Sequence, residues 1–169
     1  MVNALVLFHK VCEPERLMVI IVEKHIWSEK LTKDIEHIRT VVFVEEQGFT
    51  PEIVFDELDA RALHVALYEN ELPIASARTV KESPGIYRFG RIAVLREKRG
   101  LGLGALIMQI MEDKMKEIGA AKIILSAQSH GQGFYEKCGY NLAGEEYLIH
   151  DCPHINMEKD LAHLFKALF

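Results

Sequence analysis

The stretch Arg88–Ala105, RFGRIAVLREKRGLGLGA, decides how the rest of the chain is interpreted. It begins with an apolar, β-branched segment that is typical of a strand. A basic cluster follows, and glycines then stand at positions 100, 102 and 104, directly before a long segment of helical apolar periodicity. Glycines let consecutive N–H groups face one concavity, and a helix N-terminus adds partial positive charge. This order of strand, glycine-rich turn and helix predicts a pyrophosphate site.

Two other anion-binding turns share the glycine pattern. An NTPase phosphate loop closes with Gly-Lys-Ser/Thr, whereas Gly104 is followed by alanine and leucine, so that class is excluded. Gly100, Gly102 and Ala105 satisfy the dinucleotide fingerprint G-x-G-x-x-G/A. That fingerprint also needs an acidic residue about 20 positions later, and the next predicted strand ends in Gln128 without one. A nicotinamide-dependent oxidoreductase and a surface turn without a ligand remain as alternatives.

The composition is that of a soluble globular protein. The chain has 169 residues, of which 49% are hydrophobic and 27% charged, enough for one substantial core. A formal net charge of −5 argues against general affinity for nucleic acid. No apolar run approaches the roughly 20 residues of a membrane span, and no signal peptide is evident. The three widely spaced cysteines match neither a zinc nor a disulfide pattern, so we expect a cytoplasmic protein without a metal.

The remaining periodicities predict an α+β fold around one mixed sheet. Strands are expected at 17–27, 62–68, 74–80, 88–95, 122–127, 140–149 and 154–158, with the second and third forming a hairpin. Helices are expected at 32–47, 103–118, 133–137 and 160–169. The acidic segment 50–61 is interpreted as a loop. The whole chain, 1–169, is predicted to form a single domain, in which residues 1–16 have no assignment.

The turn Arg99–Gly104 reads R-x-x-G-x-G and resembles the acyl-CoA pyrophosphate motif of the GNAT N-acetyltransferases. One predicted helix and one predicted strand later, GFYEKCGY (133–140) resembles the late helix and turn of this family. A narrower, ElaA/YjcF-like branch is suggested by VFVEEQ (42–47), DELDARALH (56–64), LSAQ (125–128) and PHINM (153–157). The resemblance implies the GNAT acyl-CoA N-acyltransferase fold, a mixed, mostly antiparallel twisted sheet flanked by helices.

The resemblance further implies an acetyl-CoA-dependent N-acetyltransferase that acetylates a primary amine by direct attack in a ternary complex. Its motif places the CoA diphosphate on the backbone amides of Arg99, Gly100, Leu101, Gly102, Leu103, Gly104 and Ala105. The 3′-phosphate would meet Arg96, Lys98 or Arg99. The strand residues Ile92, Ala93 and Val94 match the segment that bonds the pantetheine amides and the acetyl carbonyl in this family, a modest oxyanion stabilisation.

Tyr135 matches the family tyrosine near the CoA sulfur and is the candidate acid for the leaving thiolate; the alternative is a packing role beside Phe134. The amine must arrive neutral, so a base is expected as well. His64 is the single-residue candidate because histidine titrates near neutral pH, although a histidine within a strand can also be structural.

Three further residues, Glu46, Asp59 and His154, are candidates for binding the amine. The first two belong to an acidic cluster between Glu45 and Asp59 that is either a solvated face or a rim attracting a cationic amine. The expected acceptor is a small-molecule or peptide amine, and the apolar segment LAHLFKALF (161–169) would suit either a homodimer interface or closure of the core. A non-catalytic acyl-CoA-binding or sensor module is the alternative function.

Overall fold

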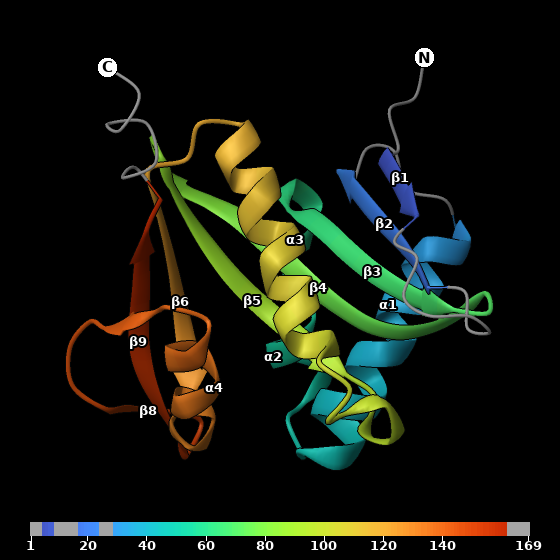
Figure 1. Ribbon diagram of the computed structural model, residues 1–169. Coiled ribbons are helices and arrows are strands. Elements are labelled where there is room, and N and C mark those ends of the chain that lie inside the picture. Colours follow the sequence, from blue (N-terminus) through green and yellow to red (C-terminus); the bar gives the residue numbers. More distant parts are fainter. Residues whose placement is uncertain (1–4, 9–16, 24–28, 162–169) are drawn as a thin grey trace, which may run out of the picture. The chain divides into compact units, whose positions relative to one another are not determined.

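The computed structural model of the protein describes residues 5–8, 17–23 and 29–161 (Figure 1). Contacts divide the chain into two compact units. Unit 1 comprises Met1–Val80 and Arg91–Ile107, and unit 2 comprises Lys81–Gly90 and Met108–Phe169. Strands β4 (Leu72–Ser83) and β5 (Ile86–Val94) and helix α3 (Leu103–Glu117) contribute residues to both units. The single-domain assignment stays a prediction.

Unit 1 contains an antiparallel run of strands in the order β1, β2, β3, β4. The bounds of the first three are Leu5–Phe8, Leu17–Glu23 and Leu63–Glu69. The predicted hairpin of β3 and β4 is confirmed, and its two turn residues, Asn70 and Glu71, have φ of 49° and 68°, as a two-residue turn of this hand requires. The predicted strand 17–27 is confirmed as far as Glu23, and 24–28 lie outside the described residues.

Helix α1 (Glu29–Arg39) continues directly into a π-helix, Thr40–Glu46, where one α-helix was predicted for 32–47. The π-helical part carries a run of valines, whose β-branched side chains fit an α-helix poorly. The predicted end is confirmed, because Gly48 follows with φ of 76°. On the inner side of these helices, the buried residues Ile38, Val42, Ala93 and Leu95 form one cluster, which fixes the last part of β5 against them.

The segment interpreted as a loop, 50–61, contains two short helices, so that interpretation was wrong. Helix α2 (Pro51–Val54) has its proline at the first helical position, where the missing N–H is not needed. A 3₁₀-helix, Glu57–Arg61, follows, and the side chain of its N-cap Asp56 accepts from the Leu58 N–H at 2.9 Å. Single turns of helix are too short to give an apolar periodicity, which explains the error.

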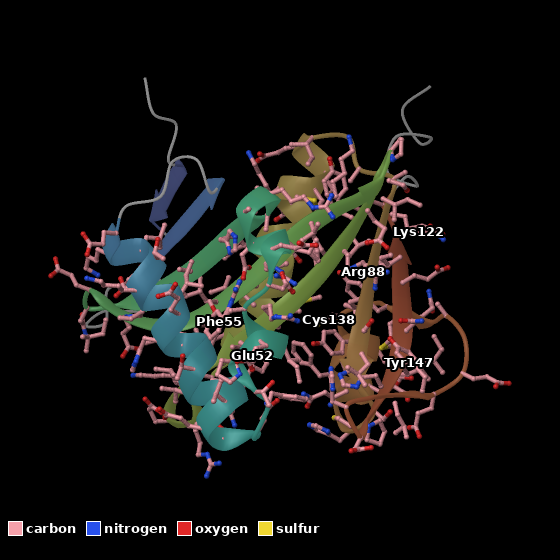
Figure 2. The ribbon with its side chains drawn as sticks, turned by 180° about the vertical axis from the view of Figure 1, so that it is seen from behind. Glu52, Phe55, Arg88, Lys122, Cys138 and Tyr147 are labelled. Atoms are coloured by element: carbon pink, nitrogen blue, oxygen red, sulfur yellow. The ribbon has the colours of Figure 1, made fainter. Side chains whose placement is uncertain are left out.

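Unit 2 contains the order β5, β6, β9, β7, with β8 also paired to β9. The bounds are Lys122–Gln128 for β6, Asn141–Leu142 for β7, Tyr147–Ile149 for β8 and Cys152–Asp160 for β9. β6 pairs in parallel with Ile86–Phe89 of β5 and antiparallel with β9. The predicted mixed, mostly antiparallel sheet is therefore confirmed. Figure 2 views the molecule from behind and labels Arg88, Lys122 and Tyr147 on β5, β6 and β8.

The part of α3 that belongs to unit 2 contains three fully buried methionines, Met108, Met111 and Met115. Gly119, with φ of 74°, ends the helix as predicted. Along β6, buried residues alternate with half-buried ones, so one face of the strand is more deeply buried than the other. The short helix predicted at 133–137 is α4 (Gln132–Lys137). The terminal helix predicted at 160–169 falls mostly outside the described residues, and Asp160 ends β9.

Within the described ranges, no helix has both the length and the apolar character needed to cross a membrane.

Candidate functional site

The predicted anion-binding turn lies entirely in unit 1. After β5, a short 3₁₀-helix (Arg96–Lys98) leads into Gly100 and Gly102, both with φ of 78°, a conformation that residues with a side chain rarely adopt. α3 begins at Leu103, and its first α-helical hydrogen bond runs from the Leu106 N–H to the Gly102 carbonyl at 3.0 Å. The backbone N–H groups of residues 103–105 therefore have no partner within the helix and are available to an anion at its positive end.

The three cations beside this turn differ in their partners. Arg99 donates to both carboxylate oxygens of Glu46, at 2.6 and 2.8 Å, and its Nε donates to the Val94 carbonyl at 2.9 Å. Lys98 forms an ion pair with Glu69. Arg96 lies 3.4 Å from Glu46, but its side chain remains 76% exposed. Arg96 is consequently the most accessible of the three to an incoming phosphate.

Glu46, predicted to bind the amine, instead lies against the glycine turn. The hydrogen bond from Arg99 holds the pKa of the Glu46 carboxyl below its usual range, and Glu46 in turn raises the pKa of Arg99. The carboxylate is supplied by the last residue of the π-helix, so the helix that packs on Ala93 also delivers the partner of Arg99. The role of Glu46 in amine binding stays a prediction that these contacts do not support.

The segment expected to bond the acyl group, Ile92–Val94, is fixed at both ends. Arg91, immediately before it, has a positive φ of 52°, and its guanidinium donates to two backbone carbonyls and one carboxylate of segment 53–56. After it, the Leu95 N–H donates to the Ile74 carbonyl of β4 at 3.0 Å. Ala93 is buried in the cluster with Ile38 and Val42. The backbone of the three residues is thus held firmly within unit 1.

A buried charged cluster links α1 and the 51–61 segment to β3 and β4. Asp59 Oδ1 accepts from Arg39 Nη1 at 2.8 Å and from Arg78 Nη1 at 3.0 Å. Arg78 also donates to both oxygens of Asp56, at 2.5 and 3.1 Å. Arg39 is 1% exposed and Asp59 9%. Asp59, predicted to bind the amine, is therefore already surrounded by two guanidinium groups; its role toward an amine stays a prediction.

His64, the candidate base, belongs to the same cluster. Its side chain is fully buried, and its Nδ1 lies 3.2 Å from Arg39 Nη2 while its Nε2 lies 3.1 Å from the Asp59 carbonyl. Because a guanidinium can only donate, Nδ1 is the acceptor and Nε2–H the donor. Burial, together with the charge of Arg39, lowers the pKa of His64 to about 4. Both ring nitrogens are engaged, so these contacts do not support His64 as the base.

The lowered pKa of His64 predicts how stability depends on pH. The folded protein keeps this imidazole neutral down to about pH 4, whereas the unfolded chain protonates it at about pH 6.5. The unfolded state therefore binds more protons in that window, and the free energy of unfolding should fall by about 1 kcal/mol per pH unit as the pH decreases from 6.5 to 4. Urea denaturation at a series of pH values measures this slope.

The matched pair for this measurement is His64→Gln and His37→Gln, since His37 lies on the exposed face of α1. The first variant should lose the slope, whatever its absolute stability, and the second should retain it. An unchanged slope in His64→Gln would show that another group is responsible.

The acidic cluster considered as an amine-attracting rim divides into two sets. Glu46, Asp56 and Asp59 are paired with arginines, whereas the exposed set consists of Glu45, Glu52 and Glu57. A pocket of about 330 Å³ opens on this side of unit 1. It is lined by Thr32, Ile35, Glu36, Arg39, Phe55, Asp56, Glu57 and Asp59. Figure 2 shows Phe55 and Glu52 beside α1.

Tyr135 lies on α4 in unit 2. Its ring makes edge contacts with Phe134 and Tyr140, at centroid distances of 5.0 and 6.3 Å. Burial raises the pKa of the Tyr135 phenol to about 12, with a smaller contribution from Cys138. The hydroxyl therefore stays protonated throughout the physiological range, as a proton donor must. Both the catalytic and the packing interpretation remain compatible with this position.

Two features fix α4 and its following turn. Lys159 Nζ donates to the Cys138 carbonyl and to Glu112 Oε2, both at 2.7 Å, and lies over the Tyr140 ring. Gly139 takes φ of 87°, which lets the chain turn directly after the helix.

His154, also in unit 2, is buried in β9 and bonds the Cys152 carbonyl through Nδ1 at 2.8 Å. Its predicted contact with an amine stays a prediction.

Sequence reasoning missed the arginines that organise unit 1. Arg39 falls within the apolar stripe of α1, and Arg78 falls in the continuously buried part of β4. A cation on a face predicted to be buried requires a buried anion. Asp56 and Asp59, three residues apart, were the available anions. The sequence therefore indicates that the buried arginines pair with carboxylates, but not which carboxylate pairs with which arginine. No comparable signal marked Arg91, because its contacts depend on where α2 ends.

The chain is similar to several known proteins. The family model described as acetyltransferase (GNAT) domain matches residues 28–161. The uncharacterized N-acetyltransferase YjcF of Bacillus subtilis (strain 168) is 36% identical over 134 residues, 79% of this chain and 95% of that protein. Crystal structures of an acyl-CoA N-acyltransferase from Pseudomonas aeruginosa and of Escherichia coli ElaA are 27% and 25% identical, each with a TM-score of 0.77. Each alignment covers 85% of this chain and 99% of the other. These similarities agree with the resemblance seen in Arg99–Gly104 and in residues 133–140.

Proposed function

The chain belongs to the GNAT acetyltransferase family, and from this premise we propose that it transfers an acetyl group from acetyl-CoA to a primary amine. The neutral amine attacks the thioester carbonyl directly while both substrates are bound. The C–N bond forms, the C–S bond breaks, and the sulfur leaves as a thiol once it has received a proton. The observation that carries the proposal is the glycine turn, whose two left-handed residues lead into the free N–H groups of α3.

The donor half of the reaction is assigned to unit 1. The N–H groups of residues 103–105 bind the CoA diphosphate, supported by the positive end of α3. Gly100 and Gly102 give the backbone the left-handed conformations that precede this helix. The N–H groups of Ile92–Val94 bond the pantetheine arm and the acetyl carbonyl, where a donor stabilises the charge that develops during attack. Fixed ends at Arg91 and Leu95 support this assignment, since preorganised donors need no rearrangement in the transition state.

Arg96 is proposed to bind the 3′-phosphate of CoA, because its side chain is the most exposed of the three cations and has only a long contact to Glu46. Replacing Arg96 by alanine should weaken CoA binding about fivefold, the value of roughly 1 kcal/mol for an exposed charge pair. Dephospho-CoA, which lacks the 3′-phosphate, should bind both forms equally. Calorimetric titration measures the four affinities.

The exposed Arg61 of the same unit provides the control, since Arg61→Ala removes an identical charge far along the chain from the turn. Equal losses for CoA and dephospho-CoA in Arg96→Ala would place the 3′-phosphate elsewhere.

The leaving-group proton is assigned to Tyr135 of unit 2. Tyr135 is half-buried and its phenol has a pKa of about 12, so it is protonated at working pH, which suits donation to the departing sulfur. The base that accepts the amine proton is given to no side chain in this proposal. His64 was the sequence-based candidate, but its ring nitrogens are taken by Arg39 and the Asp59 carbonyl. The acceptor is proposed to be a small-molecule or peptide amine.

Incubation with acetyl-CoA and a metabolite extract, followed by mass spectrometry, tests this function. The expected result is at least one amine that gains an acetyl group in place of a hydrogen, with a matching release of CoA thiol. The alternative acyl-CoA sensor would bind acetyl-CoA and release no thiol with any amine. A nicotinamide-dependent oxidoreductase would bind NAD instead.

A further inference from the structure

Arg91 adopts a left-handed backbone conformation, which is unusual for a residue with a side chain inside a β-strand. Its φ is 52°, and among the described residues it is the only non-glycine residue inside a strand with a positive φ. The preceding Gly90 could adopt such a conformation without penalty, yet its φ lies outside this region. Left-handed conformations at residues with a side chain persist only where the surroundings enforce them. The side chain of Arg91 makes three contacts that can enforce this conformation.

The guanidinium of Arg91 binds the end of α2. Nε donates to the Val54 carbonyl at 2.8 Å, and Nη2 donates to the Ile53 carbonyl at 2.5 Å and to Asp56 Oδ2 at 2.9 Å. The last carbonyls of a helix have no intrahelical partner, so these two acceptors need a donor from elsewhere. Two nitrogens of a planar group reach three acceptors at once, which a lysine ammonium on its flexible stem would not reproduce.

Neutralising Asp56 does not explain the arginine. Arg78 already donates to both oxygens of Asp56. Burial and the nearby charge of Arg78 lower the pKa of Arg91 to about 10, so a cation is held there against an electrostatic cost. The arrangement of its hydrogen bonds, rather than its charge, therefore explains why an arginine stands at position 91.

The backbone of Arg91 leads directly into the acyl-binding segment. The parallel pairing of β5 with β6 covers Ile86–Phe89, so Arg91 lies beyond the part of β5 that pairs with β6. After Arg91, Ala93 is packed into the buried cluster and the Val94 carbonyl accepts from Arg99. A change of φ at Arg91 would reorient the N–H groups that follow it in β5, a strand that also pairs with β4.

We propose that Arg91 is a positioning residue for acyl transfer: its guanidinium, clamped on the carbonyl end of α2, fixes the left-handed turn in β5 that aims the following backbone N–H groups at the acyl carbonyl. This inference rests on the proposed function, in which Ile92–Val94 bond the thioester. It gives segment 51–56 a role in holding β5 in place, although the segment itself donates no hydrogen bond to the acyl group.

The test uses the carbonyl stretch of acetyl-CoA labelled with ¹³C at the thioester carbon, recorded by infrared spectroscopy on the full chain. A hydrogen bond to a carbonyl lowers its stretching frequency, and no amine is needed for the measurement. In the wild-type protein, the carbonyl stretch of bound acetyl-CoA should lie at a lower frequency than that of free acetyl-CoA. Arg91→Lys keeps the charge without the fork, and Arg91→Gly tolerates the positive φ without the clamp; both should lose this shift. Their affinity for CoA itself should stay within about threefold of wild type, since the glycine turn is untouched.

Arg88→Ala is the control, because Arg88 lies in the same strand but pairs with Glu82 in unit 2, and it should keep the shift. A wild-type shift retained in Arg91→Gly and Arg91→Lys overturns the inference while leaving the proposed function intact. So does a loss of CoA affinity with an unchanged carbonyl band. Failure of wild type to bind acetyl-CoA would instead contradict the proposed function. If one variant does not fold, as judged by its thermal transition, the other decides the result.

Discussion

Replacing Tyr135 by phenylalanine is expected to lower the turnover number by about 100-fold or more, the usual contribution of a general acid. Phenylalanine keeps the ring that contacts Phe134 and Tyr140, so the fold and the affinity for acetyl-CoA should not change. The hydroxyl alone is removed. Because the pKa of this phenol is about 12, no loss of activity below pH 11 should be traceable to its ionisation. Steady-state kinetics with a saturating amine, under conditions where chemistry limits the rate, measure the effect.

The matched control is Tyr147→Phe. Tyr147 also lies in unit 2, and its hydroxyl bonds Ser126 and Asn156, which have no part in the proposed reaction. This variant should keep wild-type turnover. If Tyr135→Phe retains full turnover as well, Tyr135 is a packing residue and the leaving thiolate is protonated by another group.

Replacing Asp59 by asparagine is expected to destabilise the protein by about 3–5 kcal/mol, the usual cost of removing one partner from a buried ion pair. The variant leaves Arg39, which is 1% exposed, without its carboxylate, and it weakens one contact of Arg78. The uncompensated cation, rather than any lost packing, causes the effect, since asparagine has nearly the same shape. Urea denaturation at pH 7 measures the free energy of unfolding.

Glu57→Gln provides the comparison for Asp59→Asn. Glu57 belongs to the same 3₁₀-helix but is exposed, and its replacement should change stability by less than about 0.5 kcal/mol. A stability of Asp59→Asn equal to that of wild type would contradict the structural assignment. It would return Asp59 to the role predicted from the sequence, a carboxylate available to an amine.

Local features of the fold were predictable because local chemistry decides them. Gly119 ends α3, and the turn residues Asn70 and Glu71 join β3 to β4. All three residues have a positive φ, and local sequence indicates where such a conformation occurs. The glycine turn was identified for the same reason: positions 100 and 102 need left-handed backbone, and a helix follows directly. The family resemblance rested on that turn and on residues 133–140, and both the family and the fold are confirmed.

Features that depend on distant partners were not predictable in the same way. His64 has the residue type of a base, but its burial and its neighbour Arg39, 25 residues earlier in the chain, hold it neutral. Glu46 has the charge of an amine-binding group, but the π-helix carries it to Arg99, 53 residues further along the chain. No periodicity in the sequence specifies such pairs, because they depend on how separate elements pack.

The most direct test of the central claim, that the Arg99–Ala105 turn binds an acyl-CoA, is calorimetric titration of the protein with acetyl-CoA and with NAD. The acyl-CoA assignment predicts saturable one-site binding of acetyl-CoA and no heat with NAD. Gly102→Val should abolish or greatly weaken that binding, since a β-branched residue is strained at φ of 78°. Binding of NAD without binding of acetyl-CoA, or acetyl-CoA binding unchanged in Gly102→Val, would contradict it.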